Sequence, residues 1–390
     1  MASVFYRMFF DNQPADQRRL DLFEEIVVRQ QVDMMWEARL EMPVVMDALG
    51  KWTGEDEPFL QEYARVRVEV KVGNKPFVPL IDGPITERVA PRDPQPGANS
   101  VTIVVNDDSV FLDQEDSVER FDDLADSEIA ASMFSDTAQL SGPPDIEDTP
   151  PQPDNPARAS VQRGTRIQLL RALARRHHMH AYVLPGAQPG ASIGAFRSFP
   201  AAIDGLAPLI FVGDKRNLER FDPRTDARRP ADVRAATLSL RDKRIITSRA
   251  SASDATLLGD APAVNAGGNR PSRLLPPGHS DTVDLDRRTR GEVERLSLAT
   301  DATGHVMPFY YKDVLSPYRL VSVQLSDSKL SGTYLLTRVT HTLNRSVYKQ
   351  EFSARRNAAS EAAPGAAGAL ASPQAAVSAA VSFNTQGDIF

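Results

Sequence analysis

A pattern typical of serine hydrolases surrounds Ser192. Residues 190–194 are Gly-Ala-Ser-Ile-Gly, which fits the G-x-S-x-G turn that presents a nucleophilic serine between a strand and a helix. Pro185 and Pro189 precede the serine and Pro200 follows it, so the flanking strand and helix are not expected. We therefore predict a glycine-rich loop here, and we keep a serine hydrolase that uses Ser192 only as an alternative function.

The chain also carries one cluster of histidines, at positions 177, 178 and 180. Imidazoles are common metal ligands, but neighbouring side chains at the end of a helix point about 100° apart. No acidic residue lies within ten positions of the cluster to complete a metal site. Histidines interact favourably with the dipole at a helix C-terminus, which is the simpler explanation. We expect no metal and no cofactor.

Acidic residues are concentrated in one part of the chain. Between Asp107 and Asp148 there are fourteen acidic residues and one basic residue, so this stretch carries −13 and the remainder carries +6. The run Asp107, Asp108, Asp113, Glu115 and Asp116 has the composition of a calcium loop without its glycine and spacing. We predict a solvated or partner-facing acidic surface.

Composition excludes several classes of protein. The sequence contains no cysteine, which rules out disulfides, thiolate zinc sites and cysteine nucleophiles. Neither a P-loop nor a dinucleotide fingerprint is present. The net charge of −7 argues against general nucleic-acid binding. Without an apolar run of about 20 residues or a secretory leader, we expect a cytoplasmic protein that is not inserted in a membrane and is not an enzyme.

Strands dominate the hydropathy pattern. Valines alternate with charged residues over 64–72, which predicts a half-buried strand. Further strand patterns occupy 36–42, 79–89, 101–105, 181–184, 208–212 and 235–246. Residues 320–325, 334–341 and 347–352, joined by short turns, predict an antiparallel meander. Helical spacing is confined to 121–134 and 165–176.

Three segments have the composition of linkers. Residues 142–156 hold six prolines and four acidic residues, which predicts an extended linker or exposed insertion. Residues 249–281 are rich in Ala, Ser, Gly, Pro and Asp, so we expect an excursion with little fixed structure. Residues 358–390 form an Ala-rich tail, which we predict to be a flexible tether.

Several short motifs resemble, in the right order, a family of phage tail proteins. The C-terminal motifs are YYKDVLSPY at 310–318, LVSV at 320–323, LSGTY at 330–334 and VTH at 339–341, followed by 352–357. The N-terminal half contributes 66–72, 83–86, 101–105, 107–109 and 126–130, and the middle contributes 169–178 and 181–183. Together they look like the late control protein D family of tail baseplate hubs, which is related to the hub portion of VgrG.

This resemblance implies a β-rich α+β fold in which two tube-like antiparallel β-barrel domains flank a mixed α/β middle region, with flexible inserts and a disordered C-terminal tail. The domains would be 1–108, the first barrel; 109–205, the middle domain with the insert 142–156; 206–357, the second barrel with the excursion 249–281; and the tail 358–390.

The function implied by the resemblance is structural. The chain would be a homotrimeric baseplate hub of a contractile phage tail or injection system, joining a sixfold inner tube to a threefold spike. Its partners would be the inner tube protein, a separate spike protein and other baseplate components. A tube or tube-terminator protein is the alternative within the same class. Both would be components of a phage tail or injection particle assembled in the cytoplasm.

Overall fold

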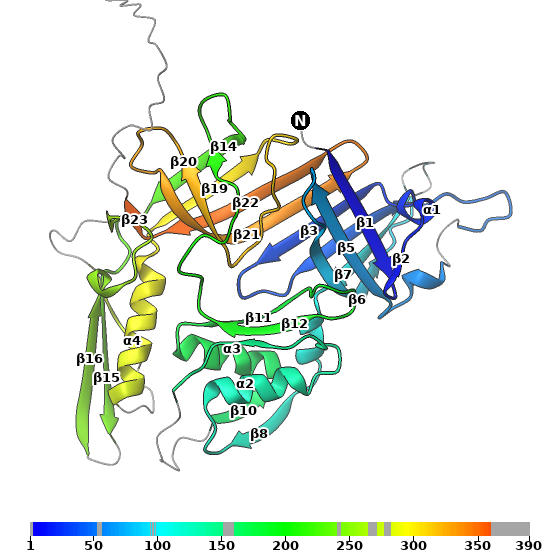
Figure 1. Cartoon of the computed structure of the whole chain (residues 1–390). Coiled ribbons are helices and arrows are strands. Elements are labelled where there is room, and N and C mark those ends of the chain that lie inside the picture. Colours follow the sequence, from blue (N-terminus) through cyan, green and yellow to red (C-terminus); the bar gives the residue numbers. More distant parts are fainter. Residues whose placement is uncertain are drawn as a thin grey trace, which may run out of the picture.

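The computed structural model describes residues 3–52, 57–93, 95, 97, 99–150, 160–239, 243–263, 271–276 and 282–359. A sheet of thirteen strands forms the body of the molecule (Figure 1). Its N-terminal strands are β1 (Val4–Phe10), β2 (Gln13–Pro14), β3 (Glu25–Gln31), β4 (Glu37–Pro43), β5 (Arg65–Val72), β6 (Val78–Val89) and β7 (Ser100–Asn106). Its C-terminal strands are β13 (Leu209–Ile210), β14 (Leu218–Thr225), β19 (Thr300–Val306), β20 (Leu320–Gln324), β21 (Gly332–Asn344) and β22 (Tyr348–Arg356).

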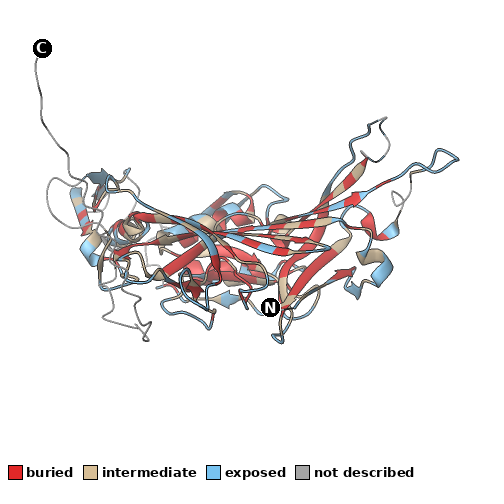
Figure 2. Ribbon diagram, turned by 90° about the horizontal axis from the view of Figure 1, so that it is seen from above, coloured by how far each residue is buried: buried red, intermediate tan, exposed pale blue. Residues whose placement is uncertain are grey.

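The two halves of this sheet meet where β3 pairs with β21. The strand order is β14-β19-β22-β21-β3-β4-β7-β6-β5-β1-β2, and β20 pairs with the free part of β21. The antiparallel register between the halves runs over seven pairs, from Gln31 opposite Arg338 to Glu25 opposite Asn344. Figure 2 shows buried residues along the strands on both sides of this junction. We call the β3–β21 pairing the seam.

Each half of the sheet has its own apolar core. The first core is built mainly from β1 and β3 to β7, with Val68 and Leu40 fully buried in it. The second core lies around β14 and β19 to β22, with Tyr334 and Val339 fully buried. The division of the chain into two barrel domains stays a prediction, because strand pairing joins both halves into one sheet.

A smaller unit between the halves carries most of the helix. It contains β8 (Ser117–Phe121), α2 (Asp126–Ser135), β9 (Asp145–Ile146), β10 (Ser160–Gly164), α3 (Arg166–Arg176), β11 (His180–Leu184) and β12 (Ile193–Arg197). The apolar faces of α2 and α3 share a core, in which Ile129, Leu170 and Phe196 are fully buried. We call this unit, residues 109–205, the middle region.

An arm extends from the C-terminal half of the sheet (Figure 1). The hairpin of β15 (Asp232–Ser239) and β16 (Arg244–Ser251), with β18 (Ser272–Leu274), packs on α4 (Thr282–Ser297). Val233 and Val293 are fully buried between them.

The predicted β-rich α+β class is confirmed, and so are the strands β4 to β7, the helices α2 and α3, and the C-terminal meander. Two predictions about strands need correction, and one helix was missed. The pattern at 235–246 belongs to the two strands of a hairpin, and the strand at 208–212 is confined to β13. Helix α4 was not predicted.

Each segment predicted to be a linker is partly ordered. In 142–156, β9 pairs with β12, and the Glu147 carboxylate accepts a hydrogen bond from the Ser198 hydroxyl at 2.6 Å. The excursion 249–281 contains the end of β16, β17 (Ala261–Pro262) and β18. The tail begins with β23 (Ala358–Ala359), which pairs with β17. Backbone pairing therefore anchors all three segments, while 151–159, 264–270, 277–281 and 360–390 lie outside the described residues.

The seam contains a buried histidine, His341. His341 on β21 is 0% exposed, and its Nδ1 lies 2.8 Å from the Tyr348 hydroxyl. Its Nε2 lies 3.3 Å from Oε1 of Gln30 on β3, whose amide donates to the Leu80 carbonyl at 2.7 Å. The partners suit a neutral ring that donates from Nε2 and accepts at Nδ1. Burial lowers the pKa of His341 from 6.5 to about 3.

This burial makes the stability of the fold depend on pH. Below pH 6.5 His341 becomes protonated in the unfolded chain. In the native chain it takes up this proton only near pH 3. The native state therefore loses stability as the pH falls through this window, by up to about 1.4 kcal/mol per pH unit. His341→Gln removes this term, so the free-energy gap between wild type and variant in urea unfolding should shrink between pH 7 and pH 4. A gap that stays constant over this range would mean that the imidazole takes up its proton at the same pH in the folded and the unfolded chain.

Candidate functional site

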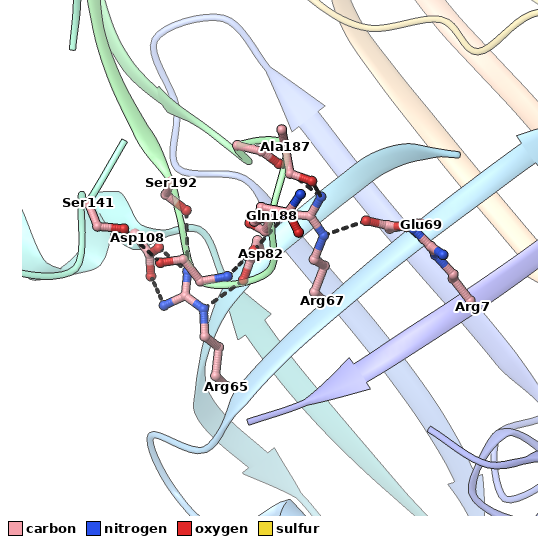
Figure 3. Close-up of polar contacts among 12 residues, drawn as sticks. Arg7, Arg65, Arg67, Glu69, Asp82, Asp108, Ser141, Ala187, Gln188 and Ser192 are labelled. Carbon is pink, nitrogen blue, oxygen red and sulfur yellow. Dashed lines mark hydrogen bonds and ion pairs between the residues drawn. The ribbon is translucent and has the colours of Figure 1, made fainter. Parts of the chain in front are cut away.

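Three charged side chains on β5 lie on the face that meets the middle region. Alternation along a strand places Arg65, Arg67 and Glu69 on one side, opposite the core valines. Figure 3 shows how they meet Asp82 on β6 and Asp108. Arg65 Nε donates to Asp82 Oδ1 at 2.7 Å, and its terminal nitrogens donate to both carboxylate oxygens of Asp108. Together these five residues form what we call the ionic cluster.

The middle region closes over this cluster with residues 185–192. Arg67 donates to the Gly186 carbonyl at 2.8 Å and to the Gln188 carbonyl at 3.1 Å. In return, the Gly190 amide donates to Asp82 Oδ2 at 3.0 Å. A Cβ on Gly186 would lie 1.7 Å from the Ala191 carbonyl oxygen, so the loop can take this path only with glycine there. Gly186 therefore allows the loop to follow the path on which it contacts the ionic cluster.

Burial and charge balance explain the chemistry of the cluster. Arg67, Glu69, Asp82 and Asp108 are each at most 2% exposed. Burial raises the pKa of Asp108, although its hydrogen bond and ion pair with Arg65 act against this. Burial opposes the charged form of Arg65, yet Asp108 and Asp82 raise the pKa of this guanidinium overall. Arg65 therefore stays charged, and both arginines bond the loop, Arg65 through Ser192 and Arg67 through Gly186 and Gln188.

The candidate nucleophile Ser192 contacts the ionic cluster. Ser192 is 0% exposed, and its hydroxyl accepts a hydrogen bond from Arg65 at 3.3 Å. The strand β12 follows it directly, where a nucleophile elbow requires a helix. Ser192 therefore lies away from solvent and contributes to the joint between β5 and the middle region.

The acidic run divides into buried and exposed parts. Asp107 is 2% exposed and accepts hydrogen bonds from the amides of Trp36 at 2.6 Å and Ser109 at 2.9 Å. Burial raises the pKa of Asp107 to about 6. The prediction of a solvated acidic surface is therefore wrong for Asp107 and Asp108. It is correct for Asp113, Glu115 and Asp116, which are exposed.

The histidine cluster follows the end of α3, as predicted, but its three rings contact three different carboxylates. His177 lies 2.8 Å from Asp126, His178 lies 3.0 Å from Glu294 on α4, and His180 lies 2.8 Å from Asp33. Among the described residues, no group of three or more side chains is arranged to hold a metal ion. Each histidine instead links α3 or β11 to another element.

A second joint connects the middle region to both halves of the sheet. The rings of Tyr182 on β11 and Tyr318 stack with centroids 3.7 Å apart and planes inclined by 8°. The Tyr318 hydroxyl accepts a hydrogen bond from the Asp33 amide at 2.7 Å. His180 packs against Phe199, with ring centroids 4.0 Å apart. We call these five residues the aromatic joint, where residues of the N-terminal half, the middle region and the C-terminal half meet.

The sequence patterns did not predict either joint. Arg65, Arg67 and Glu69 have the alternation of solvent-facing residues, and nothing in the spacing shows that the distant segment 185–192 covers them. One signal was available in the sequence. Arg67 and Glu69 have opposite charges at positions i and i+2 of one strand face, and the next strand carries Asp82 in an Asp-Gly pair. The candidate site of this chain is therefore a pair of rigid joints.

Solved structures share this fold over most of the chain. A 43 kDa tail protein of prophage MuSo2 from Shewanella oneidensis is 15% identical, with a TM-score of 0.64, and the match covers 91% of this chain and 98% of that one. A tail protein from Neisseria meningitidis is 12% identical, with a TM-score of 0.62 and coverage of 91% and 97%. An Escherichia coli component of the type VI secretion system, described as similar to the T4 tail proteins gp27 and gp5, is 10% identical, with a TM-score of 0.51 and coverage of 91% and 77%.

No family model and no curated protein matches the sequence. The structural matches confirm the predicted resemblance at the level of the fold, which is that of tail proteins and a type VI secretion component. In the part of the chain that the structure describes, no helix is both long and apolar enough to cross a lipid bilayer.

The ionic cluster allows a paired test of buried and exposed arginines. Arg67 and Arg7 both bond Glu69, at 2.6 and 2.5 Å, but the Arg67 side chain is 1% exposed and that of Arg7 is 49% exposed. Arg67→Met should lower the free energy of unfolding by about 3 to 5 kcal/mol, because it leaves buried carboxylates without their partner. Arg7→Met should cost less than about 1 kcal/mol. Equal losses in urea unfolding would contradict a cluster closed by the loop.

Proposed function

We propose that three copies of this chain form the hub of a contractile phage tail or injection system and join a sixfold inner tube to a threefold spike. The observation that carries the proposal is the seam, which holds two antiparallel half-sheets in one fixed relation within each chain. The fold shared with tail proteins supports the same function.

The arithmetic of symmetry follows from the two halves. Three chains that each present two similar sheet surfaces offer six positions around a ring. A ring of this kind needs closed threefold symmetry with heterologous contacts between neighbours. In this proposal 1–108 and 206–357 are the two barrel domains, and 109–205 is the middle domain that fixes their spacing. Binding therefore takes the place of catalysis.

The proposed partners are the inner tube protein on one face, a separate spike protein on the other, and other baseplate components around the rim. Assembly would take place in the cytoplasm, without nucleic-acid binding or membrane insertion by this chain. A tube or tube-terminator protein would build a hexameric ring from one surface per chain. Two half-sheets with separate cores fit the trimer better.

The oligomeric state separates these two structural functions. Light scattering of the purified protein should give about three times the chain mass of 42.8 kDa. Addition of tube and spike proteins should then yield particles in which electron microscopy places the trimer between them. A chain that stays monomeric at high concentration, also with spike protein present, contradicts the hub, and a hexamer favours a tube protein.

The hydrolase alternative is tested at the buried serine. Ser192→Ala removes one hydroxyl that accepts a 3.3 Å hydrogen bond and leaves the ion pairs of Arg65 in place. The variant should fold, form the same oligomer and assemble with tube and spike as the wild type does. Loss of particle activity in a variant with an unchanged melting temperature would instead support chemistry at Ser192.

A further inference from the structure

An open cavity of about 810 Å³ lies between the middle region, the arm and the sheet. Helix α3 contributes one wall, and α4 with β18 contributes another. The remaining wall consists of the end of β3 and parts of β21 and β22, next to the seam. The cavity adjoins the aromatic joint, since Asp33, His180 and Phe199 of that joint line it.

Arginine dominates the lining of this cavity. Two carboxylates, Asp33 and Glu292, face seven guanidinium groups, those of Arg175, Arg176, Arg273, Arg288, Arg295, Arg338 and Arg355. The Glu292 carboxylate forms ion pairs with both Arg295, at 2.6 Å, and Arg273, at 3.1 Å. The cavity therefore concentrates positive charge in a chain whose net charge is −7. Concave sites lined by one sign of charge attract ligands of the opposite sign.

Some polar groups of the lining lack partners among the described residues. Arg175 and Arg338 are exposed and neither forms an ion pair there, although Arg175 Nε donates to the Arg171 carbonyl at 3.2 Å. Nδ1 of His180 lies 2.8 Å from Asp33, and its buried Nε2 has no hydrogen-bond partner in the described part of the chain. Guanidinium groups without a carboxylate partner favour a ligand that brings acceptor oxygens.

The chain itself carries a surface with the matching chemistry. Residues 113–123, which we call the acidic segment, expose six carboxylates, those of Asp113, Glu115, Asp116, Glu119, Asp122 and Asp123, beside one arginine. No residue of the acidic segment lines the cavity of its own chain. Contact between the two surfaces therefore requires a second copy.

We propose that the arginine cavity of one copy receives the acidic segment of the next copy around the ring. The proposal rests on the trimeric hub and names one of its contacts. Planar guanidinium groups pair with carboxylates through two parallel hydrogen bonds, and partial exclusion of water strengthens such pairs. Because cavity and segment are different surfaces of one chain, the contact is heterologous, as a closed ring requires.

The experiment reverses charge on each side of the contact. Arg175→Glu with Arg338→Glu changes two exposed cavity arginines, and Glu115→Arg with Glu119→Arg changes two exposed carboxylates of the acidic segment. Each pair of substitutions should leave the melting temperature unchanged and weaken self-association in sedimentation by about tenfold or more. A chain with all four substitutions should regain the wild-type mass, because the new glutamates of the cavity can pair with the new arginines of the acidic segment.

The matched control reverses two exposed cations outside the cavity, through Lys215→Glu and Arg244→Glu, and should keep the wild-type mass. If the wild type is trimeric and both contact variants remain trimeric, this inference fails while the hub stands. If the wild type is monomeric, the hub itself fails. A labelled single-stranded oligonucleotide provides a further test. If it binds the wild type and only the cavity variant fails to bind it, the cavity is a nucleic-acid site and the proposed contact is overturned.

Discussion

The structure depends on one strand pairing, that between β3 and β21. An unpaired sheet edge exposes backbone donors and acceptors, and the seam satisfies those of both halves with each other across seven residue pairs. Because this pairing joins residues about 310 positions apart, the N-terminal and C-terminal cores have a fixed register and twist. Within the seam, the neutral His341 ring forms hydrogen bonds with Tyr348 and Gln30 that only this register allows.

The middle region is held by polar and aromatic contacts and by apolar contacts with the first core, to which Tyr182 and Ala195 belong. The ionic cluster ties the loop 185–192 to β5 and β6, and the aromatic joint ties β11 to both halves. Buried ion pairs often add little net stability, because the loss of hydration offsets their attraction. Their directional hydrogen bonds do restrict geometry, which is the property that the proposed symmetry adaptor would require.

Sequence patterns predicted those elements whose apolar residues recur with a regular period. β5, α3 and the C-terminal meander follow this rule, because one face of each packs on a core. Strand β19 escaped prediction since its Thr-Asp-Ala-Thr-Gly-His-Val sequence has little apolar content, and α4 since its arginines and acids obscure a narrow apolar face. The joints escaped because they form between segments about 120 and 140 positions apart, as Arg67 with Gly186 and Tyr182 with Tyr318 do.

The most direct test of this account is whether the three parts of the chain keep fixed distances. The sequence has no cysteine, so cysteines placed at the exposed Glu41 on β4, Ser135 on α2 and Lys349 on β22 can carry spin labels in pairs. Pulsed electron spin resonance, with labelled chains diluted among unlabelled ones, should give one narrow distance distribution for each pair. A broad distribution between positions 41 and 349 would mean that the halves move independently, and would contradict a rigid adaptor built on the seam.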